Sequence, residues 1–310
     1  MMIGGIDDVY LFIILSLVLF VLAPFLGMFS MGLLRQMSAR MQNRAGPPLL
    51  QPYYDVRKLL MKEETATDPM IGAWVFSFFL FNALGVIILV TLGDLLIVLF
   101  LLGFAQLSLS LGGFAGSLPD NHLGANRNLL RVLSVEPLLL MLPIAALLLN
   151  QNFLIKDLAV NSNIILYFPV GATVVIFALV VGMQKGPFDL STAHQKKRNR
   201  NLAELSGKNL ALVEMGHWFE RFAFLALFSL FFNFSGLLNS VLNNMFLAVI
   251  LDLVLKFVIA FAAVLVVGRI DNATSKLPWD RLPSFSFYVM WPLMFVNIVL
   301  VYGFLRWDWF

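Results

Sequence analysis

The sequence predicts an all-α membrane protein with about eight transmembrane helices, forming a single polytopic domain over residues 1–310. The first observation is a mean hydropathy of +0.87. The second is a charged fraction of only 13%, where soluble domains carry about 25%. The third is a recurrence of apolar runs of about 20 residues, each long enough to cross a hydrocarbon core of about 30 Å.

The apolar segments set the order of the helices. The second and third spans are joined at Gly93-Asp94, which leaves room only for a tight turn. The third span carries glycine, serine and glutamine, and small residues allow close packing against other helices. The predicted spans cover residues 9–33, 71–92, 94–114, 131–149, 163–183, 211–237, 245–267 and 286–305.

The charges predict how the chain crosses the membrane. Most of the 21 Lys and Arg residues fall in the loops after spans one, three, five and seven, where Arg127 and Arg131 are counted after span three. By the positive-inside rule these loops are cytoplasmic and both termini lie on the outer side. The long cytoplasmic loops, 34–70 and 184–209, are therefore the expected places for partners to bind.

The loop at 34–70 contains a helix of its own. Gly46-Pro47-Pro48 ends the first helix, and the segment from Tyr53 to Lys62 then alternates apolar and charged residues at helical spacing. This pattern predicts an amphipathic helix. Such a helix either lies on the membrane surface or packs against a soluble partner.

Several ionisable residues fall inside predicted spans, where each is costly and therefore a functional hypothesis. Glu136 and Glu214 have no cation at helical spacing. A carboxyl group in that setting can exchange a proton near neutral pH. His217 is either an intermediate proton carrier or a packed histidine. Asp252 and Lys256 are four residues apart and are expected to form an intramembrane ion pair on one helix face.

The composition excludes some chemistry. The chain has no cysteine, so it cannot ligate an iron–sulfur cluster through its own thiolates. The three histidines are scattered, and no residue pattern indicates a metal site or a catalytic group. The net charge of +3 follows from the basic loops and does not indicate nucleic-acid binding.

Four long motifs are shared with a known family. They are RMQNRAGPPLLQPYYDVRKLLMKEE (40–64), GANRNLLRVLSVEPLLL (124–140), GPFDLSTAHQ (186–195) and ELSGKNLALVEMGHWFERF (204–222). In this order they resemble the membrane subunit that respiratory complex I shares with group 4 energy-converting nickel-iron hydrogenases. The sequence around AHQ (193–195) is more similar to that of the hydrogenase branch than to that of complex I.

The resemblance implies a non-catalytic subunit of an oxidoreductase complex in the cytoplasmic membrane of a prokaryote. The expected partners are the hydrogenase large and small subunits and ion-translocating, antiporter-like membrane subunits. The nickel-iron centre and the iron–sulfur clusters would lie in partner subunits, and ferredoxin would supply the electrons. This chain would bind no cofactor, seat the large subunit, and link the redox reaction to translocation of protons or sodium ions.

The resemblance also implies roles for particular residues. The implied proton path consists of Asp189, Glu204, Glu136 and Glu214. Because partners are expected at the long cytoplasmic loops, the candidate docking residues are Asp55, Arg57 and Lys58 in the first of them, and Lys196, Lys197, Arg198 and Arg200 in the second.

One stretch, KKRNRN at 196–201, departs from the family pattern. Two glutamates that the family carries fall on Lys196 and Asn199, and its usual tyrosine falls on Leu205. Cations in place of acids disfavour a proton path through this loop. Three explanations remain open: the coupling route differs, the loop binds an acidic partner surface, or it is a solvated loop that serves topology.

Other functions also fit the sequence. One is a quinone-binding membrane subunit of a complex I-type dehydrogenase. Another is a subunit of a related sulfane reductase or formate hydrogenlyase. The last is a membrane scaffold that docks a redox module without moving ions.

Overall fold

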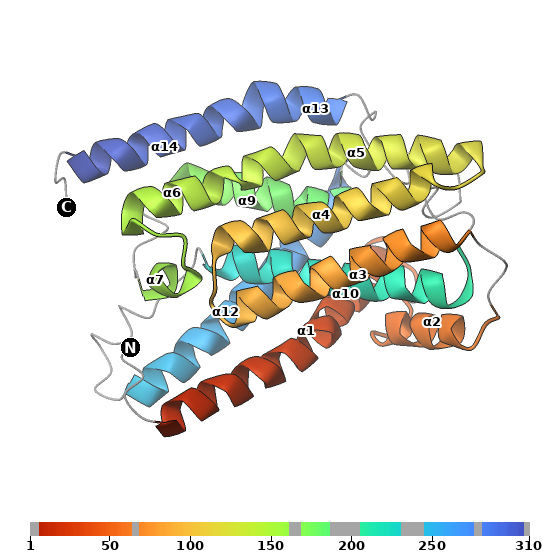
Figure 1. Ribbon diagram of the computed structural model, residues 1–310, viewed down its shortest axis with the longest axis horizontal. Helices are drawn as coiled ribbons and strands as arrows, with labels where there is room; N and C mark the ends of the chain where they lie inside the picture. The colour runs from red at the N-terminus through yellow and green to blue at the C-terminus, as the bar shows by residue number, and fades with distance from the viewer. Residues whose placement is uncertain are drawn as a thin grey trace.

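The computed structural model describes residues 6–63, 68–160, 169–186, 205–230, 245–275 and 281–306. These residues are nearly all helical, and the only strand-like pairing among them is an isolated bridge between Asp94 and Leu154. The predicted all-α class is confirmed. Figure 1 shows a bundle in which α1 begins and α14 ends at one end, while α2 lies at the other.

The helices follow the order of the apolar segments. Their bounds are α1 Ile6–Met41, α2 Gln51–Leu60, α3 Pro69–Val90, α4 Leu95–Phe114, α5 Pro119–Leu139, α6 Met141–Asn150, α7 Ile155–Val160, α9 Pro169–Gly182, α10 Gly207–Leu230, α12 Met245–Ala273, α13 Arg281–Phe285, the π-helix η3 Ser286–Met290, and α14 Trp291–Arg306.

Six of the described helical segments are long and apolar enough to cross a membrane. The other two predicted spans, 163–183 and 211–237, correspond to α9 and α10. The described part of α9 has only 14 residues, and α10 carries Glu214, Glu220 and Arg221 within its length. The number of crossings and the side on which the termini lie stay predictions.

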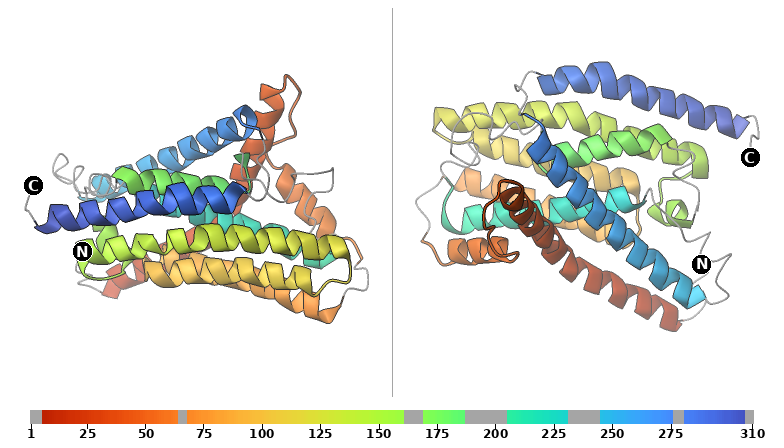
Figure 2. Two further views of the ribbon diagram at one scale, coloured as in Figure 1. Left: turned by 90° about the horizontal axis from the view of Figure 1, so that it is seen from above. Right: turned by 180° about the vertical axis from the view of Figure 1, so that it is seen from behind.

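The amphipathic helix predicted in the first cytoplasmic loop is present as α2. Its buried side consists of Pro52 and Val56, and Val56 packs with Met31 of α1 and Trp218 of α10 in one apolar cluster. The apolar face of α2 is therefore covered by its own chain. The opposite face is exposed at the end of the bundle (Figure 2).

The predicted turn between the second and third spans joins α3 to α4. Leu92 adopts a positive φ of 54°, and the Asp94 carboxylate caps α4 by accepting a hydrogen bond from Leu96 N at 2.8 Å. An aspartate at this position satisfies one of the free N–H groups of the first helical turn.

The prediction for the fourth span was wrong at its start. The sequence placed the start at residue 131 and counted Arg131 as a loop cation, whereas α5 begins at Pro119 and leaves Arg131 only 6% exposed. A hydropathy pattern treats a charge as solvated, but here tertiary contacts stabilise it. The helix is interrupted at Leu140, between Pro137 and Pro143, because proline lacks a backbone N–H and crowds the preceding turn.

Helix α10 packs against α1, α2, α3, α9 and α12 and forms the centre of the molecule. Glycines allow two of these contacts to be close. A Cβ at Gly27 of α1 would lie 1.9 Å from the Trp218 carbonyl oxygen, and a Cβ at Gly216 would lie 2.4 Å from the Phe78 ring. The hydrophobic effect does not drive helices together in lipid. Small residues instead let the helices approach closely, so that van der Waals packing stabilises the contact.

Candidate functional site

Glu136 lies on α5, directly before Pro137, and its side chain is turned toward α4. A Cβ at Gly103 of α4 would lie 3.1 Å from Glu136 Oε2, so the glycine makes room for this carboxylate. Arg131 and Glu220 line the same small cavity as Glu136. The fold therefore surrounds Glu136 with one cation and one further acid.

This cavity has a volume of about 20 Å³. Its polar lining comes from Gln106 of α4, Arg131 and Glu136 of α5, and Glu220 of α10. A cavity of this size has room for about one water molecule, which requires two to four polar partners. The geometry thus allows a single water to connect the Glu136 and Glu220 carboxyl groups.

Arg131 connects three helices around the cavity. Its Nη2 donates to Gln106 Oε1 of α4, and its Nη1 donates to the Val181 carbonyl oxygen of α9 at 3.4 Å. Asn128 Nδ2 continues the network by donating to Gln106 O at 3.2 Å and Ser110 Oγ at 2.8 Å. Because a buried cation is costly unless paired and hydrogen-bonded, these contacts explain how Arg131 is tolerated between apolar helices.

Glu220 is 2% exposed and contacts His217 on its own helix. His217 Nδ1 lies 2.9 Å from Glu220 Oε2, and the imidazole ring packs edge-on against Phe78 at 5.1 Å. Glu214 lies one turn before His217 and is partly exposed. Within the described residues, no hydrogen bond or ion pair joins Glu214 to this cluster. The spacing of 214, 217 and 220 nevertheless places three ionisable groups in sequence along α10.

Gln106 and Arg131 were not predicted from the sequence as site residues, and Glu220 was assigned no role. Glu220 is 84 positions from Glu136, so only the packing of α10 against the other helices brings the two acids to one cavity. A signal was present in the run of polar residues within the third span, where Gln106, Ser108 and Ser110 all fall inside an apolar segment.

Asp252 and Lys256 lie on α12, outside the cluster around Glu136. Lys256 Nζ is 2.7 Å from Asp252 Oδ2, in the i, i+4 arrangement expected from the sequence. The lysine side chain is 23% exposed and the aspartate 11%. The pair is partly buried and does not line the cavity that Glu136 and Glu220 share.

The exposed face of α2 carries the other candidate residues. Asp55 accepts from Arg35 Nη1 at 2.7 Å and from Gln51 Nε2 at 3.0 Å, so its carboxylate ties α2 to α1. Arg57 and Lys58 are exposed, as are Tyr53 and Tyr54, of which 43% and 49% are accessible. A basic and aromatic surface is thus presented beyond the end of the bundle.

The remaining candidates lie outside the described residues. These are the acids Asp189 and Glu204 and the cations Lys196, Lys197, Arg198 and Arg200. In the part of the chain that the structure describes, no group of three or more His, Asp or Glu side chains is placed to hold a metal ion.

Membrane-crossing helices around a buried acid–arginine cluster, with a basic amphipathic helix at one end, define an integral membrane subunit of the complex I-like type. The chain belongs to the NADH dehydrogenase family, whose sequence model matches residues 13–302. The resemblance inferred from the four motifs is therefore confirmed.

Individual relatives fall in both branches of this family. Formate hydrogenlyase subunit 4 of Escherichia coli is 27% identical over 88% of this chain and 92% of its own length. Hydrogenase-4 component C of the same organism is 30% identical over 75% of this chain and 80% of its own length. A subunit of the NADH-quinone oxidoreductase of Bacillus cytotoxicus is 28% identical over 93% of both chains.

The fold also matches a solved structure. A chain of the membrane-bound sulfane sulfur reductase, an archaeal respiratory membrane complex, superimposes with a TM-score of 0.80 over 94% of this chain and 99% of its own. At 22% identity this match establishes the fold alone.

Proposed function

We propose that this chain is the membrane-anchoring and coupling subunit of a multisubunit, ferredoxin-linked energy-converting hydrogenase. In this role it seats the catalytic large subunit on the exposed face of α2 and links the redox reaction to translocation of protons or sodium ions. The observation that carries the proposal is a buried cluster in which Glu136, Glu220 and Arg131 line a water-sized cavity and His217 contacts Glu220.

The cluster suits proton transfer because its members are held by packing and joined in short steps. His217 and Glu220 are in contact at 2.9 Å, and Glu220 shares with Glu136 a cavity that has room for one water. Glu214 precedes them on α10, toward the end of the bundle where α2 packs. We therefore include Glu220 and His217 in the proton path, together with Glu136, Glu214, Glu204 and Asp189.

The exposed face of α2 suits docking of a large subunit. Interfaces are enriched in tyrosine and arginine, and α2 presents both at positions that no described element of the chain covers. The KKRNRN stretch at 196–201, outside the described residues, carries further cations. A basic surface of this kind favours an acidic partner surface, because complementary charges steer the partner and set its orientation.

A charge-reversal variant tests the docking role. Arg57→Glu with Lys58→Glu is expected to release the large subunit from washed membranes, because the partner then meets like charges. Lys156→Glu is the matched control, since Lys156 is exposed on α7 at the opposite end of the bundle (Figure 1). Retention of the large subunit by the Arg57/Lys58 variant would remove the docking assignment.

The identity of the complex is tested by purifying it through a tag on this chain. The proposal expects copurification of a nickel-containing large subunit and hydrogen evolution from reduced ferredoxin. The similarity to hydrogenase-4 component C and formate hydrogenlyase subunit 4 supports this outcome. A nickel-free preparation without hydrogen evolution would contradict it.

A second candidate is a quinone-binding membrane subunit of a complex I-type dehydrogenase. The similarity to a subunit of NADH-quinone oxidoreductase, over 93% of the chain, favours it. Copurified quinone together with quinone-dependent NADH oxidation would select this candidate over the hydrogenase.

A further inference from the structure

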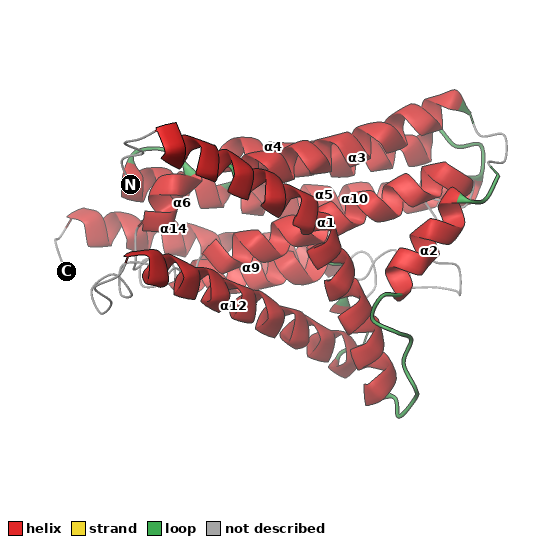
Figure 3. Cartoon of the chain, turned by 90° about the horizontal axis from the view of Figure 1, so that it is seen from below, coloured by secondary structure: helices red, strands yellow, loops and turns green. Residues whose placement is uncertain are grey.

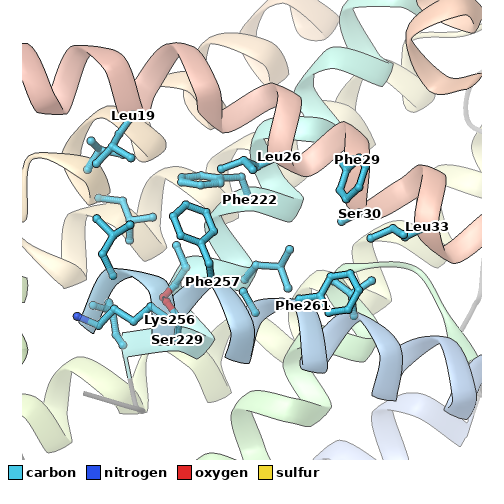
Figure 4. A pocket seen from close by; sticks show the side chains of 18 of the residues that line it. Leu19, Leu26, Phe29, Ser30, Leu33, Phe222, Ser229, Lys256, Phe257 and Phe261 are labelled. Carbon is cyan, nitrogen blue, oxygen red and sulfur yellow. The ribbon is translucent and has the colours of Figure 1, made fainter. Parts of the chain in front are cut away.

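A second and larger cavity lies between α1, the C-terminal end of α3, α10 and α12, away from the cluster around Glu136. It has a volume of about 470 Å³. Phe222 and Ala226 of α10 contribute to its lining, and Phe257 and Ala260 of α12 form part of one wall. Figure 4 shows the phenyl rings of Phe222 and Phe257 near its centre, between the two outer helices.

The cavity is a wedge that is closed at one end. Helices α1 and α12 converge toward their C-terminal ends (Figure 3), where Asn272 Nδ2 donates to Ser38 Oγ at 3.0 Å. At the same end Gly268 is so close to Met37 that an added Cβ would lie 2.7 Å from its sulfur atom. From this closure the two helices separate, and α10 lies between them (Figure 3).

The lining of the cavity is apolar and therefore favours a hydrocarbon ligand. The hydroxyl groups of Ser30 and Ser229 donate to carbonyl oxygens of their own helices, Gly27 O at 2.7 Å and Ala226 O at 2.8 Å. Neither hydroxyl group is therefore available to donate a hydrogen bond to a ligand. Lys256 is the only charged residue among the described residues of the lining, and its amine is already bound to Asp252.

The rim of the groove carries partly exposed aromatic side chains. Phe29, Phe257 and Phe261 line it and are between 38% and 47% exposed, whereas Ser229 at its floor is buried. Lys256 lies five residues into the predicted crossing of α12, and helical side chains lean toward the N-terminus. Its amine therefore reaches toward the membrane interface, and Figure 4 shows it pointing away from the phenyl rings.

We propose that this groove holds one hydrocarbon chain of a membrane phospholipid, entering between α1 and α12 with the head group on the Lys256 side. A transmembrane helix of another subunit is too wide, because a helix is about 10–12 Å across and little more than one turn would fill the cavity. An empty groove would forfeit the dispersion contacts of its aromatic walls. This site does not depend on the hydrogenase proposal, since lipid binding requires no electron donor.

The test is photolabelling of the intact complex in phosphatidylethanolamine vesicles, with a phosphatidylethanolamine whose acyl chain carries a diazirine. The label is expected on the α10 and α12 segments that line the groove. In Ala226→Phe, labelling there is expected to fall about tenfold, because the ring displaces several methylene groups from the site. Ala260→Phe fills the groove from the other wall and should give the same loss.

Ala262→Phe is the matched control, because Ala262 is exposed on α12 but does not line the groove. Its labelling should equal that of the unmodified chain. Equal labelling of all three variants would overturn the proposal. It would also be overturned if a diazirine on an isoprenoid quinone tail labelled the groove while the phospholipid did not.

Discussion

At the scale of single residues, Arg131 determines what the buried cluster can do. Its guanidinium group reaches α4 through Gln106 and α9 through Val181, and it lines the cavity that Glu136 and Glu220 share. A positive charge at this cavity lowers the electrostatic cost of a negative charge on a carboxyl group that lines it. Removing that charge would leave an ionised acid without this counter-ion in a low-dielectric site.

Two substitutions of Arg131 should therefore separate the effect of its charge from the effect of its planar guanidinium group. Arg131→Met is expected to destabilise the protein by about 3–5 kcal/mol, because it breaks a buried charged network on one side only. Arg131→Lys keeps the charge but loses the planar fork that reaches two helices at once, so its effect should be smaller. Thermal unfolding of the purified complex measures both, and equal stability of all three forms would contradict the assigned role.

At the scale of helices, close contacts between backbones determine how α10 is held at the centre. Gly27 brings α1 against the Trp218 carbonyl oxygen, and Gly216 brings α10 against Phe78. Helix α2 is then fastened to α10 and α1 by Val56 and by the Arg35–Asp55 ion pair. The proposed docking face and the buried acids are thus linked through the packing of α10.

Alanine substitution of two glycines tests this packing. Gly27→Ala is expected to destabilise the fold by about 1–3 kcal/mol or more, because the new methyl group meets backbone that cannot rotate away. Gly303→Ala is the control, since no atom of the described residues lies within 4 Å of its added Cβ. There alanine should be neutral or stabilise α14 by up to about 1 kcal/mol. A Gly27→Ala complex as heat-stable as the Gly303→Ala complex would refute the close contact.

At the scale of the whole molecule, the proposed docking and coupling roles require α2 to face the cytoplasm and the α6–α7 connection to face the other side. Helix α1 begins and α14 ends at the end of the bundle opposite α2 (Figure 1). Because the chain contains no cysteine, single-cysteine variants report accessibility without a background.

An impermeant maleimide applied to intact cells should label Lys156→Cys and leave Lys58→Cys unmodified. In inside-out vesicles from which the large subunit has been stripped, the pattern should reverse, since both side chains are exposed at opposite ends of the bundle. Labelling of Lys58→Cys in intact cells would invert the topology that the positive-inside rule predicts.

Features that depend on residues close together in the chain could be predicted from the sequence, whereas contacts between distant helices could not. Apolar runs predicted the helices, Gly93-Asp94 predicted the α3–α4 turn, and helical spacing predicted α2. Arg131 was wrongly counted as a loop cation because its hydrogen-bond partners lie on α4 and α9, far from it in the chain. The proximity of Glu220 to Glu136 arises only from packing between distant helices, which no local pattern records.

The most direct test of the central claim is the number of ions moved per reducing equivalent consumed, measured in inside-out vesicles with a fluorescent gradient probe. Glu136→Gln and Glu220→Gln each keep the shape of the side chain but remove the exchangeable proton. Both are expected to lower this ratio severalfold, because a glutamine side chain cannot take up and release a proton. Glu63→Gln, at an exposed position beyond α2, should leave it unchanged. A normal ratio in both cluster variants would contradict the account and leave the chain a docking scaffold.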